Sequence, residues 1–189
     1  MSTAQERIKA AFWRLLREQA YSKITVTQIC KTAGISRVTF YIWYEDKESL
    51  INDLFQDMAD DGVRYYNEQK PNYKKYGLAE SCGNILETIF YLHGKYPFLL
   101  MQVYETPEAA DRSLYHRYHY LIIEQITSLT EKSFSETLPP LSTKEIVTFI
   151  CNGLSSMIQV DAKAGKSLEE IKSNAALLLD KVLKSGLFV

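Results

Sequence analysis

The sequence has few cysteines, prolines and glycines, and no long apolar run. Its 3 cysteines stand singly, without a CxxC pair, so we expect reduced thiols and no disulfide framework. With 5 prolines and 8 glycines in 189 residues, the composition excludes a collagen-like or low-complexity chain. No run of about 20 apolar residues is present, so we expect no membrane span.

Signals for export, metal binding and catalysis are also missing. Residues 1–17 are amphipathic and contain no apolar block before a cleavage site, so we expect a cytoplasmic protein without a signal peptide. The three histidines have no cysteine partners at ligand spacing, so neither a metal nor a cofactor is expected. The chain has no glycine-rich phosphate loop and no GxSxG or Ser-x-x-Lys motif, which argues against an enzyme.

The whole chain has no large excess of positive or negative charge, but its two parts differ in charge. The 22 basic and 23 acidic residues give a net charge of -1. Residues 1–50 carry eight Lys/Arg and five Asp/Glu, a net of +3, so the remainder carries 14 basic and 18 acidic residues, a net of -4. A basic N-terminal part on an acidic body is typical of a protein that offers one face to phosphate groups.

Helical signals are abundant and strand signals are scarce. Apolar residues recur at helical spacing along most of the chain, and Ser or Thr stands three residues before Glu or Gln at several helix starts. The pattern predicts an all-α fold of about nine helices. The predicted helices cover about 3–20, 25–33, 37–43, 46–66, 78–96 and 107–134, a short one can begin at Pro97, and two more begin at Ser142 and Ser167.

Two short predicted helices have the dimensions of a helix-turn-helix. Thr25 begins the first helix in a capping box with Gln28, Gly34 ends it, and Ser36 is the N-cap of the second. A helix this short fits a major groove about 12 Å wide while the first helix packs behind it. The alternative is an ordinary helical hairpin within a bundle.

The segment from Thr25 to Leu50 closely resembles the DNA-binding domain of the TetR family of bacterial regulators. The matching features are the threonine cap, Ala33-Gly34-Ile35-Ser36 at the turn, Thr39-Phe40-Tyr41 in the next helix, and Lys47, Glu48 and Leu50 at the start of the fourth helix. The resemblance implies a helix-turn-helix DNA-binding domain over residues 1–47 and an effector-binding and dimerisation domain over residues 48–189.

The resemblance also implies roles at individual positions. Arg37 would contact a guanine edge through O6 and N7, and Thr39 would contact a base or a thymine methyl group. Phosphate contacts would come from the start of the first short helix and from Tyr41 and Lys47, while the Trp43 indole could donate to the DNA backbone. The complete predicted DNA-binding set is Thr25, Thr27, Ser36, Arg37, Val38, Thr39, Tyr41, Trp43 and Lys47.

Three positions depart from the usual family pattern. Val38 replaces a frequent glycine, Ile42 replaces a usually polar residue, and Tyr44 replaces a common phenylalanine. Val38 and Ile42 make the exposed face of the second short helix more apolar than usual. Contacts with thymine methyl groups and contacts with the body of the protein are both open explanations.

The last two predicted helices are apolar around more than a narrow stripe, which indicates burial on two sides. We expect them to form a four-helix interface with a second copy of the chain, and a thick monomeric core is the alternative. The predicted dimer contacts are Ile150, Gly153, Leu154, Met157, Leu178 and Val182.

The middle of the chain is rich in aromatic residues, and aromatic walls with a few polar groups suit a small apolar or aromatic effector. The predicted ligand contacts are Tyr91, His93, Met101, Tyr104, Tyr115, Tyr118, His119 and Met157. The sequence thus predicts a homodimeric, ligand-responsive repressor that binds a near-palindromic double-stranded operator. The alternatives are an activator of the same fold and a helical protein-interaction module that does not bind DNA.

Overall fold

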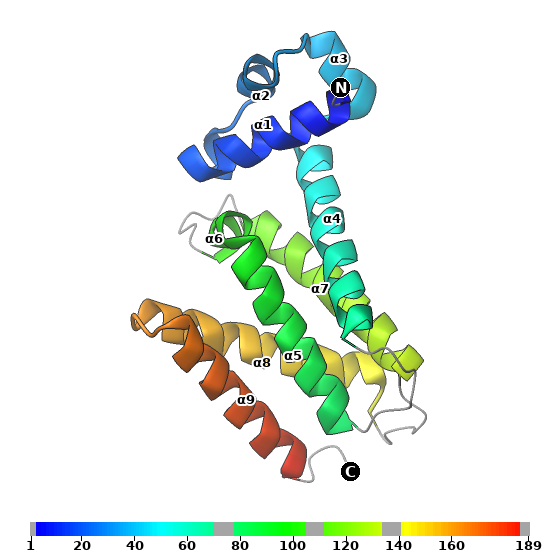
Figure 1. The fold of residues 1–189 in the computed structure, drawn as a ribbon, viewed down its shortest axis with the longest axis vertical. Coiled ribbons are helices and arrows are strands. Elements are labelled where there is room, and N and C mark those ends of the chain that lie inside the picture. Colours follow the sequence, from blue (N-terminus) through cyan, green and yellow to red (C-terminus); the bar gives the residue numbers. More distant parts are fainter. Residues whose placement is uncertain (1–2, 70–77, 105–111, 134–140, 186–189) are drawn as a thin grey trace. The chain divides into compact units, whose positions relative to one another are not determined.

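The computed structural model describes residues 3–69, 78–104, 112–133 and 141–185. Within these ranges the chain forms nine α-helices, one short 3-10 helix and no strand (Figure 1), which confirms the predicted all-α fold. The elements are α1 (Ala4–Glu18), η1 (Tyr21–Lys23), α2 (Val26–Ala33), α3 (Arg37–Trp43), α4 (Lys47–Glu68), α5 (Leu78–Lys95), α6 (Pro97–Tyr104), α7 (Arg112–Ser133), α8 (Thr143–Lys163) and α9 (Leu168–Lys184). None of these helices combines the length and apolar character that crossing a membrane requires.

The helix ends follow the local signals in the sequence. Capping boxes form at Thr25, Ser142 and Ser167, with the side chain three residues later reaching back in each case. Gly34 ends α2 in the left-handed conformation at φ 64°, which a residue without Cβ adopts without strain. Pro97 opens the short helix α6, which confirms that a helix begins at this residue.

The helices group into two compact units. The first comprises Met1–Met58 and Lys95–His119, and the second comprises Ala59–Gly94 and Tyr120–Val189. Helices α4 and α7 each contribute residues to both units, so the units are not simply successive parts of the chain. The functional boundary expected at residue 47 therefore remains a prediction, distinct from this structural division.

The first unit is built around the apolar face of α1. Ile8, Phe12 and Leu16 recur at helical spacing and are almost completely buried, and α1 packs against α2, α3 and α6. Ile29 of α2 and Phe40 of α3 are fully buried in the same unit. This packing fixes the two short helices relative to α1.

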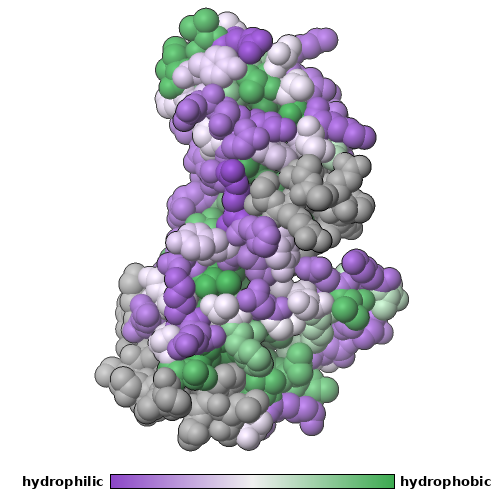
Figure 2. Space-filling model, turned by 180° about the vertical axis from the view of Figure 1, so that it is seen from behind, coloured by the Kyte–Doolittle hydropathy of each residue, from purple (hydrophilic) through white to green (hydrophobic). Residues whose placement is uncertain are grey.

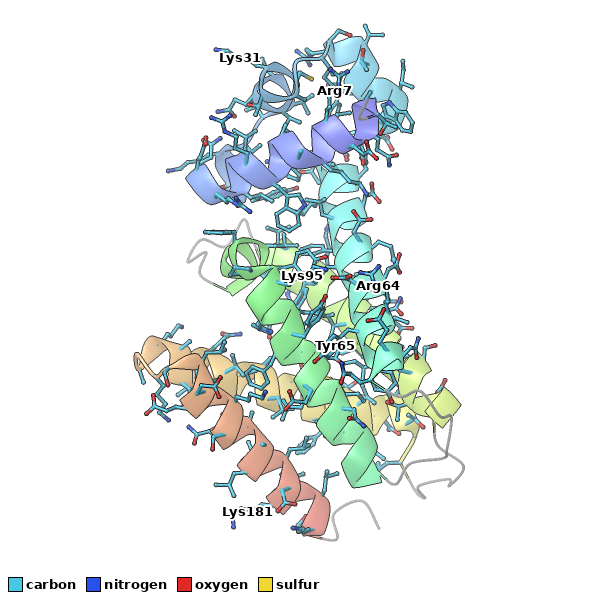
Figure 3. All side chains as sticks on the ribbon, viewed as in Figure 1. Arg7, Lys31, Arg64, Tyr65, Lys95 and Lys181 are labelled. Atoms are coloured by element: carbon cyan, nitrogen blue, oxygen red, sulfur yellow. The ribbon has the colours of Figure 1, made fainter. Side chains whose placement is uncertain are left out.

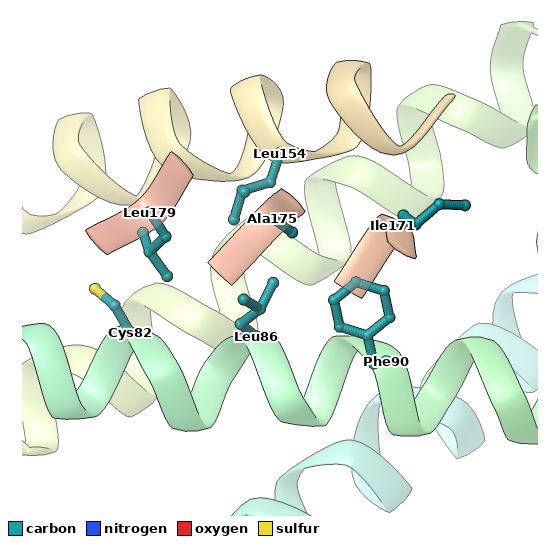
Figure 4. Packing of buried hydrophobic residues seen from close by; sticks show 7 residues of the cluster. All are labelled: Cys82, Leu86, Phe90, Leu154, Ile171, Ala175 and Leu179. Carbon is teal, nitrogen blue, oxygen red and sulfur yellow. The ribbon is translucent and has the colours of Figure 1, made fainter. Parts of the chain in front are cut away.

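The second unit holds two apolar clusters. One joins α5, α8 and α9 through Cys82, Leu86, Phe90, Leu154, Ile171, Ala175 and Leu179 (Figure 4). The other joins α4, α5, α7 and α8 through Tyr66, Ile85, Ile126, Val147 and Cys151. All three cysteines of the chain are buried, and burial raises the pKa of the Cys82 thiol to about 11, so these thiols behave as small apolar groups.

Candidate nucleic-acid interface

Helices α2 and α3 meet at a tight glycine turn. After Gly34, the backbone N–H of Ile35 donates to the carbonyl of Cys30 at 3.1 Å and closes the end of α2. The Ser36 hydroxyl then accepts from the backbone N–H of Thr39 at 3.0 Å and begins α3. These local bonds, together with the buried Ile29 and Phe40, give the pair a helix-turn-helix arrangement.

One face of α3 is open to solvent. Arg37, Tyr41 and Trp43 are exposed, and the Arg37 guanidinium donates to the Tyr41 hydroxyl at 3.2 Å. Val38 and Ile42 are even more open, with 73% and 72% of their surface exposed. The structure therefore exposes Arg37, Val38, Tyr41 and Trp43 of the predicted DNA-binding set on α3, together with Ile42, which that set did not include.

The threonines and the serine of the predicted DNA-binding set lie at the starts of α2 and α3, where most of them form local hydrogen bonds. Thr25 and Thr27 are exposed at the start of α2, where the Thr25 hydroxyl caps the helix by accepting from the N–H of Gln28 at 3.3 Å. Thr39 is half-buried, and its hydroxyl lies 2.9 Å from that of Ser36. Exposed basic side chains of the same unit include Arg7 on α1 and Lys31 on α2 (Figure 3).

Lys47 has contacts inside the protein that the sequence did not indicate. Its ammonium group donates to the carbonyls of Tyr21 at 3.1 Å and Ile24 at 3.2 Å, and it lies 4.3 Å from the centre of the Tyr21 ring. The side chain thus ties the start of α4 to the η1 turn. A phosphate contact by Lys47 remains a prediction, and it would have to share the ammonium group with these carbonyls.

A polar network behind α3 was also missed from the sequence. The Tyr44 hydroxyl donates to Asp53 at 2.6 Å, and Lys9 forms ion pairs with Asp53 at 2.9 Å and Asp57 at 2.6 Å. Burial opposes ionisation of Asp53, but the hydrogen bonds from Tyr44 and Lys9 outweigh it and lower the pKa of this carboxyl. The network connects α1, the end of α3 and α4, and so holds the exposed helix in place.

The predicted dimer residues divide between the core and the surface. Leu154 is buried in the α5–α8–α9 cluster, and Ile150 and Met157 pack partly against it. Gly153 and Leu178 are exposed, and Val182 is half-buried. Exposed apolar residues that the prediction did not include are Phe149 and Val160 on α8 and Leu168 and Leu177 on α9.

The predicted ligand residues fall in both units. In the second unit, Tyr91 stacks on Tyr65 at 4.0 Å between ring centres and donates to Asp61, while Met157 is half-buried and packs against the α5–α8–α9 cluster. His93 Nδ1 lies 2.8 Å from the carbonyl of Ile89. The side chains of Met101 and Tyr104 lie outside the described ones.

The remaining three predicted ligand residues lie together on α7. Tyr118 is buried against Phe55, and the ring of Tyr115 lies 4.0 Å from that of His119. His119 is 7% exposed, and in the described ranges its buried Nε2 has no hydrogen-bond partner. Burial, helped by the nearby His116, lowers the pKa of His119 to about 4 and keeps the ring neutral at pH 7.

A surface pocket lies on α4, where Asp60, Val63, Arg64, Asn67 and Glu68 line it. Four of these five side chains are charged or polar, so its lining does not resemble the aromatic site expected for the effector. No set of three potential metal ligands comes together among residues 3–69, 78–104, 112–133 and 141–185.

The geometry of α2 and α3 defines the class of the N-terminal unit as a helix-turn-helix DNA-binding domain. Residues 8–54 match the family model described as bacterial regulatory proteins, tetR family. The predicted resemblance to the TetR family is thereby confirmed for residues 8–54, the part of the chain that the family model matches.

Two curated proteins each match about a third of the chain. An uncharacterized HTH-type transcriptional regulator, YxbF of Bacillus subtilis, is 36% identical over 58 residues, which are 31% of this chain and 15% of that protein. The HTH-type dhaKLM operon transcriptional activator DhaS of Lactococcus lactis is 35% identical over 69 residues, which are 34% of this chain and 37% of that protein. The chain thus matches well under half the length of either relative.

The fold likeness extends over the whole chain. A TetR-family transcriptional regulator from Streptomyces coelicolor has a crystal structure that superposes with a TM-score of 0.71 and 17% identity, covering 98% of this chain and 100% of the other. This similarity shows that the body of the protein, and not only its N-terminal domain, has the fold of TetR-family regulators.

Proposed function

We propose that this protein is a ligand-responsive transcriptional regulator that binds a near-palindromic DNA operator as a homodimer and acts as a repressor. The observation that carries the proposal is the open face of α3 in a TetR-family domain, where Arg37 and Tyr41 are exposed side by side. The net positive charge of residues 1–50 supports an approach of this face to phosphate.

In this proposal Arg37 contacts a guanine edge, because its planar guanidinium can donate to O6 and N7 together. Tyr41, Trp43 and the start of α2 with Thr25 and Thr27 contact the DNA backbone and fix the register of α3. Ser36 and Thr39 shape the start of α3, because their hydroxyls bond to each other and to the helix backbone. Such a protein acts in the cytoplasm, where the chromosome of a bacterium lies.

Dimerisation is supported by the outer faces of α8 and α9. Large apolar side chains remain exposed there in the single chain, and they are continuous with the small residue Gly153, which permits close approach of a second helix. Burial of this face in a two-fold interface would give the assembly two copies of α3, one for each half-site of an operator.

The effector is proposed to be a small apolar or aromatic molecule with a hydrogen-bonding group. The support is the group of Tyr115, Tyr118 and His119, in which a neutral imidazole has a buried nitrogen without a partner in the described part of the chain. Helix α4 has residues in both compact units, so it is suited to carry a change in the body to the N-terminal helices.

The binding experiment uses duplexes that cover the DNA next to the protein's own gene. We expect affinity to fall steeply as salt rises from 50 to 200 mM, because basic side chains displace counterions from phosphates. Arg37→Ala should lower specific affinity by about 10- to 100-fold and relax the base preference at one position in each half-site. Unchanged affinity and base preference in this variant would contradict the proposed role of Arg37.

Activation is the second candidate, because the similar DhaS of Lactococcus lactis is named a transcriptional activator. A reporter fused to the bound promoter separates the two functions. Deletion of the gene should raise reporter expression if the protein is a repressor and lower it if the protein is an activator.

A further inference from the structure

Two large aliphatic side chains stand on the outer face of α3 without packing against the described chain. Val38 and Ile42 are four residues apart, so they lie on the same side of the helix about 6 Å apart along its axis. More than two thirds of each side chain is exposed, whereas Phe40 and Tyr44 on the inner side are buried. Figure 2 shows hydrophobic surface on the part of the first unit that contains α3.

Folding alone does not account for this pair. Contact with the body of the protein was one of the two open explanations, and within the first unit, which includes part of that body, the high exposure of both residues argues against it. Single exposed aliphatic residues are common on proteins, but Val38 and Ile42 stand one turn apart on the same side of the helix and form an apolar strip, and Tyr41 and Trp43 of the same helix are also exposed. A strip of this kind marks a contact surface.

The chemistry of the major groove indicates which partner the strip fits. Base edges in that groove present hydrogen-bonding groups and one apolar group, the 5-methyl of thymine. A separation of about 6 Å along the helix compares with about 3.4 Å between successive base pairs, so the two side chains can reach methyl groups one or two steps apart. Arg37, directly before Val38, supplies the neighbouring polar contact.

We propose that Val38 and Ile42 determine operator specificity by packing against thymine 5-methyl groups. This inference rests on the proposed function and adds to it the composition of the half-site, namely thymines within two base-pair steps of each other beside the guanine that Arg37 contacts. Removing one of these methyl groups should weaken binding by roughly fourfold, the factor that corresponds to burial of one methyl group.

The test replaces thymine by deoxyuridine, which removes the methyl group and leaves the hydrogen-bonding edge unchanged. A duplex that the wild-type protein selects from a randomised library is resynthesised with uracil at each thymine in turn, and affinities are measured by fluorescence anisotropy. We expect wild-type binding to weaken at two thymines per half-site. Val38→Ala should lose the uracil effect at one of them and Ile42→Ala at the other.

Leu141→Ala is the matched control, because Leu141 is another exposed aliphatic residue and lies outside both helices of the DNA-binding motif. This variant should keep the full uracil effect at both positions. Circular dichroism should show the same helix content in all three variants, since each removes an exposed side chain.

The outcomes separate this inference from the proposed function. Sequence-specific binding that is equally tight with uracil at every thymine would overturn the thymine contact and leave the regulator proposal standing. Absence of any selected sequence would overturn both. If Val38→Ala and Ile42→Ala bind all duplexes like the wild type but lose a protein partner, the strip would be a protein-binding surface instead.

Discussion

At the scale of single residues, the Tyr44 hydroxyl connects three helices. It donates to Asp53 of α4 at 2.6 Å and accepts from the Gln5 amide of α1 at 3.3 Å, while Lys9 neutralises the same carboxylate. The exposed face of α3 ends at this residue, so the network holds the helix that the DNA contacts require. A phenylalanine is common at this position of the resembling family and would keep the ring but not these bonds.

We expect Tyr44→Phe to lower the free energy of unfolding by about 1 kcal/mol, the usual net contribution of one such hydrogen bond. The pKa of Asp53 should rise at the same time, because its carboxylate loses a donor. Urea denaturation followed by circular dichroism measures the first effect. Tyr41→Phe is the control, since that hydroxyl is exposed and should contribute little; equal losses in the two variants would refute the role given to Tyr44.

At the scale of elements, the η1 turn depends on a lysine from a distant helix. The Lys47 ammonium donates to the carbonyls of Tyr21, Ser22 and Ile24, and the Tyr21 carbonyl also accepts from the backbone N–H of Ile24. We expect Lys47→Met to lower the free energy of unfolding by about 1–3 kcal/mol, because charged donors form the stronger hydrogen bonds. Thermal unfolding checks this, with the exposed Lys31→Met as the matched control.

DNA binding by the same variant distinguishes the internal role of Lys47 from the predicted phosphate contact. A lysine that contacts phosphate contributes about one unit to the slope of log affinity against log salt. If Lys47→Met unfolds like the wild type and reduces only this slope, the internal role would be wrong and the phosphate contact right.

The helix ends could be predicted from the sequence, whereas the interactions between helices could not. Caps such as Ser142 with Glu145 join residues three positions apart, so their spacing is visible in the sequence. The contact of Tyr44 with Gln5 joins residues 39 positions apart, and that of Lys47 with Tyr21 joins residues 26 apart. Such pairs depend on how the helices pack, which a single sequence does not specify.

The same difference between local signals and contacts between helices applies to the candidate site residues. The exposure of Arg37 and Val38 follows from helical periodicity around the buried Phe40, so the face of α3 could be predicted. For Leu154 periodicity alone could not decide between the core and a partner chain, because both environments favour leucine. The structure places it in the core cluster with α5 and α9.

Helix α7 carries a group whose protonation should make stability depend on pH. The pKa of His119 is about 4 in the folded protein and near its ordinary value of 6.5 in the unfolded chain. Between pH 4 and pH 6.5 the unfolded chain binds a proton at His119 that the folded protein does not bind. The contribution of the neutral His119 to the free energy of unfolding is therefore complete above pH 6.5 and is lost as the pH falls toward 4. A shift of this size corresponds to roughly 3 kcal/mol.

The measurement is the free energy of unfolding at pH 7.5 and pH 5 for the wild type and two variants. His119→Phe keeps a ring against Tyr115 but cannot titrate, so this variant should lose much of the pH dependence of stability. Some pH dependence should remain, because burial also lowers the pKa of His93. His116→Gln, at an exposed position of the same helix, should retain most of it. An unchanged dependence in His119→Phe would show that this residue is not its source.

At the scale of the whole molecule, the single chain leaves an apolar surface uncovered on its last two helices. Phe149 and Val160 lie on one side of α8 with the small residues Gly153 and Ser156 between them, and Leu177 is exposed on α9. The opposite sides of both helices are already filled by the core cluster. A second copy of the chain is the partner that the proposed function requires for this surface.

We expect the double variant Val160→Glu and Leu177→Glu to weaken dimerisation by about 100-fold or more, because each new carboxylate would be buried without a partner in the interface. Sedimentation equilibrium at micromolar concentration should then show a dimer for the wild type and a monomer for the variant. Leu141→Glu places the same charge at an exposed leucine before α8 and should stay dimeric.

The monomeric double variant should also bind a duplex with two half-sites no more tightly than a duplex with one half-site, since the linked second contact is lost. A wild-type monomer, or a double variant that remains dimeric, would place the interface elsewhere and leave the outer faces of α8 and α9 without this role.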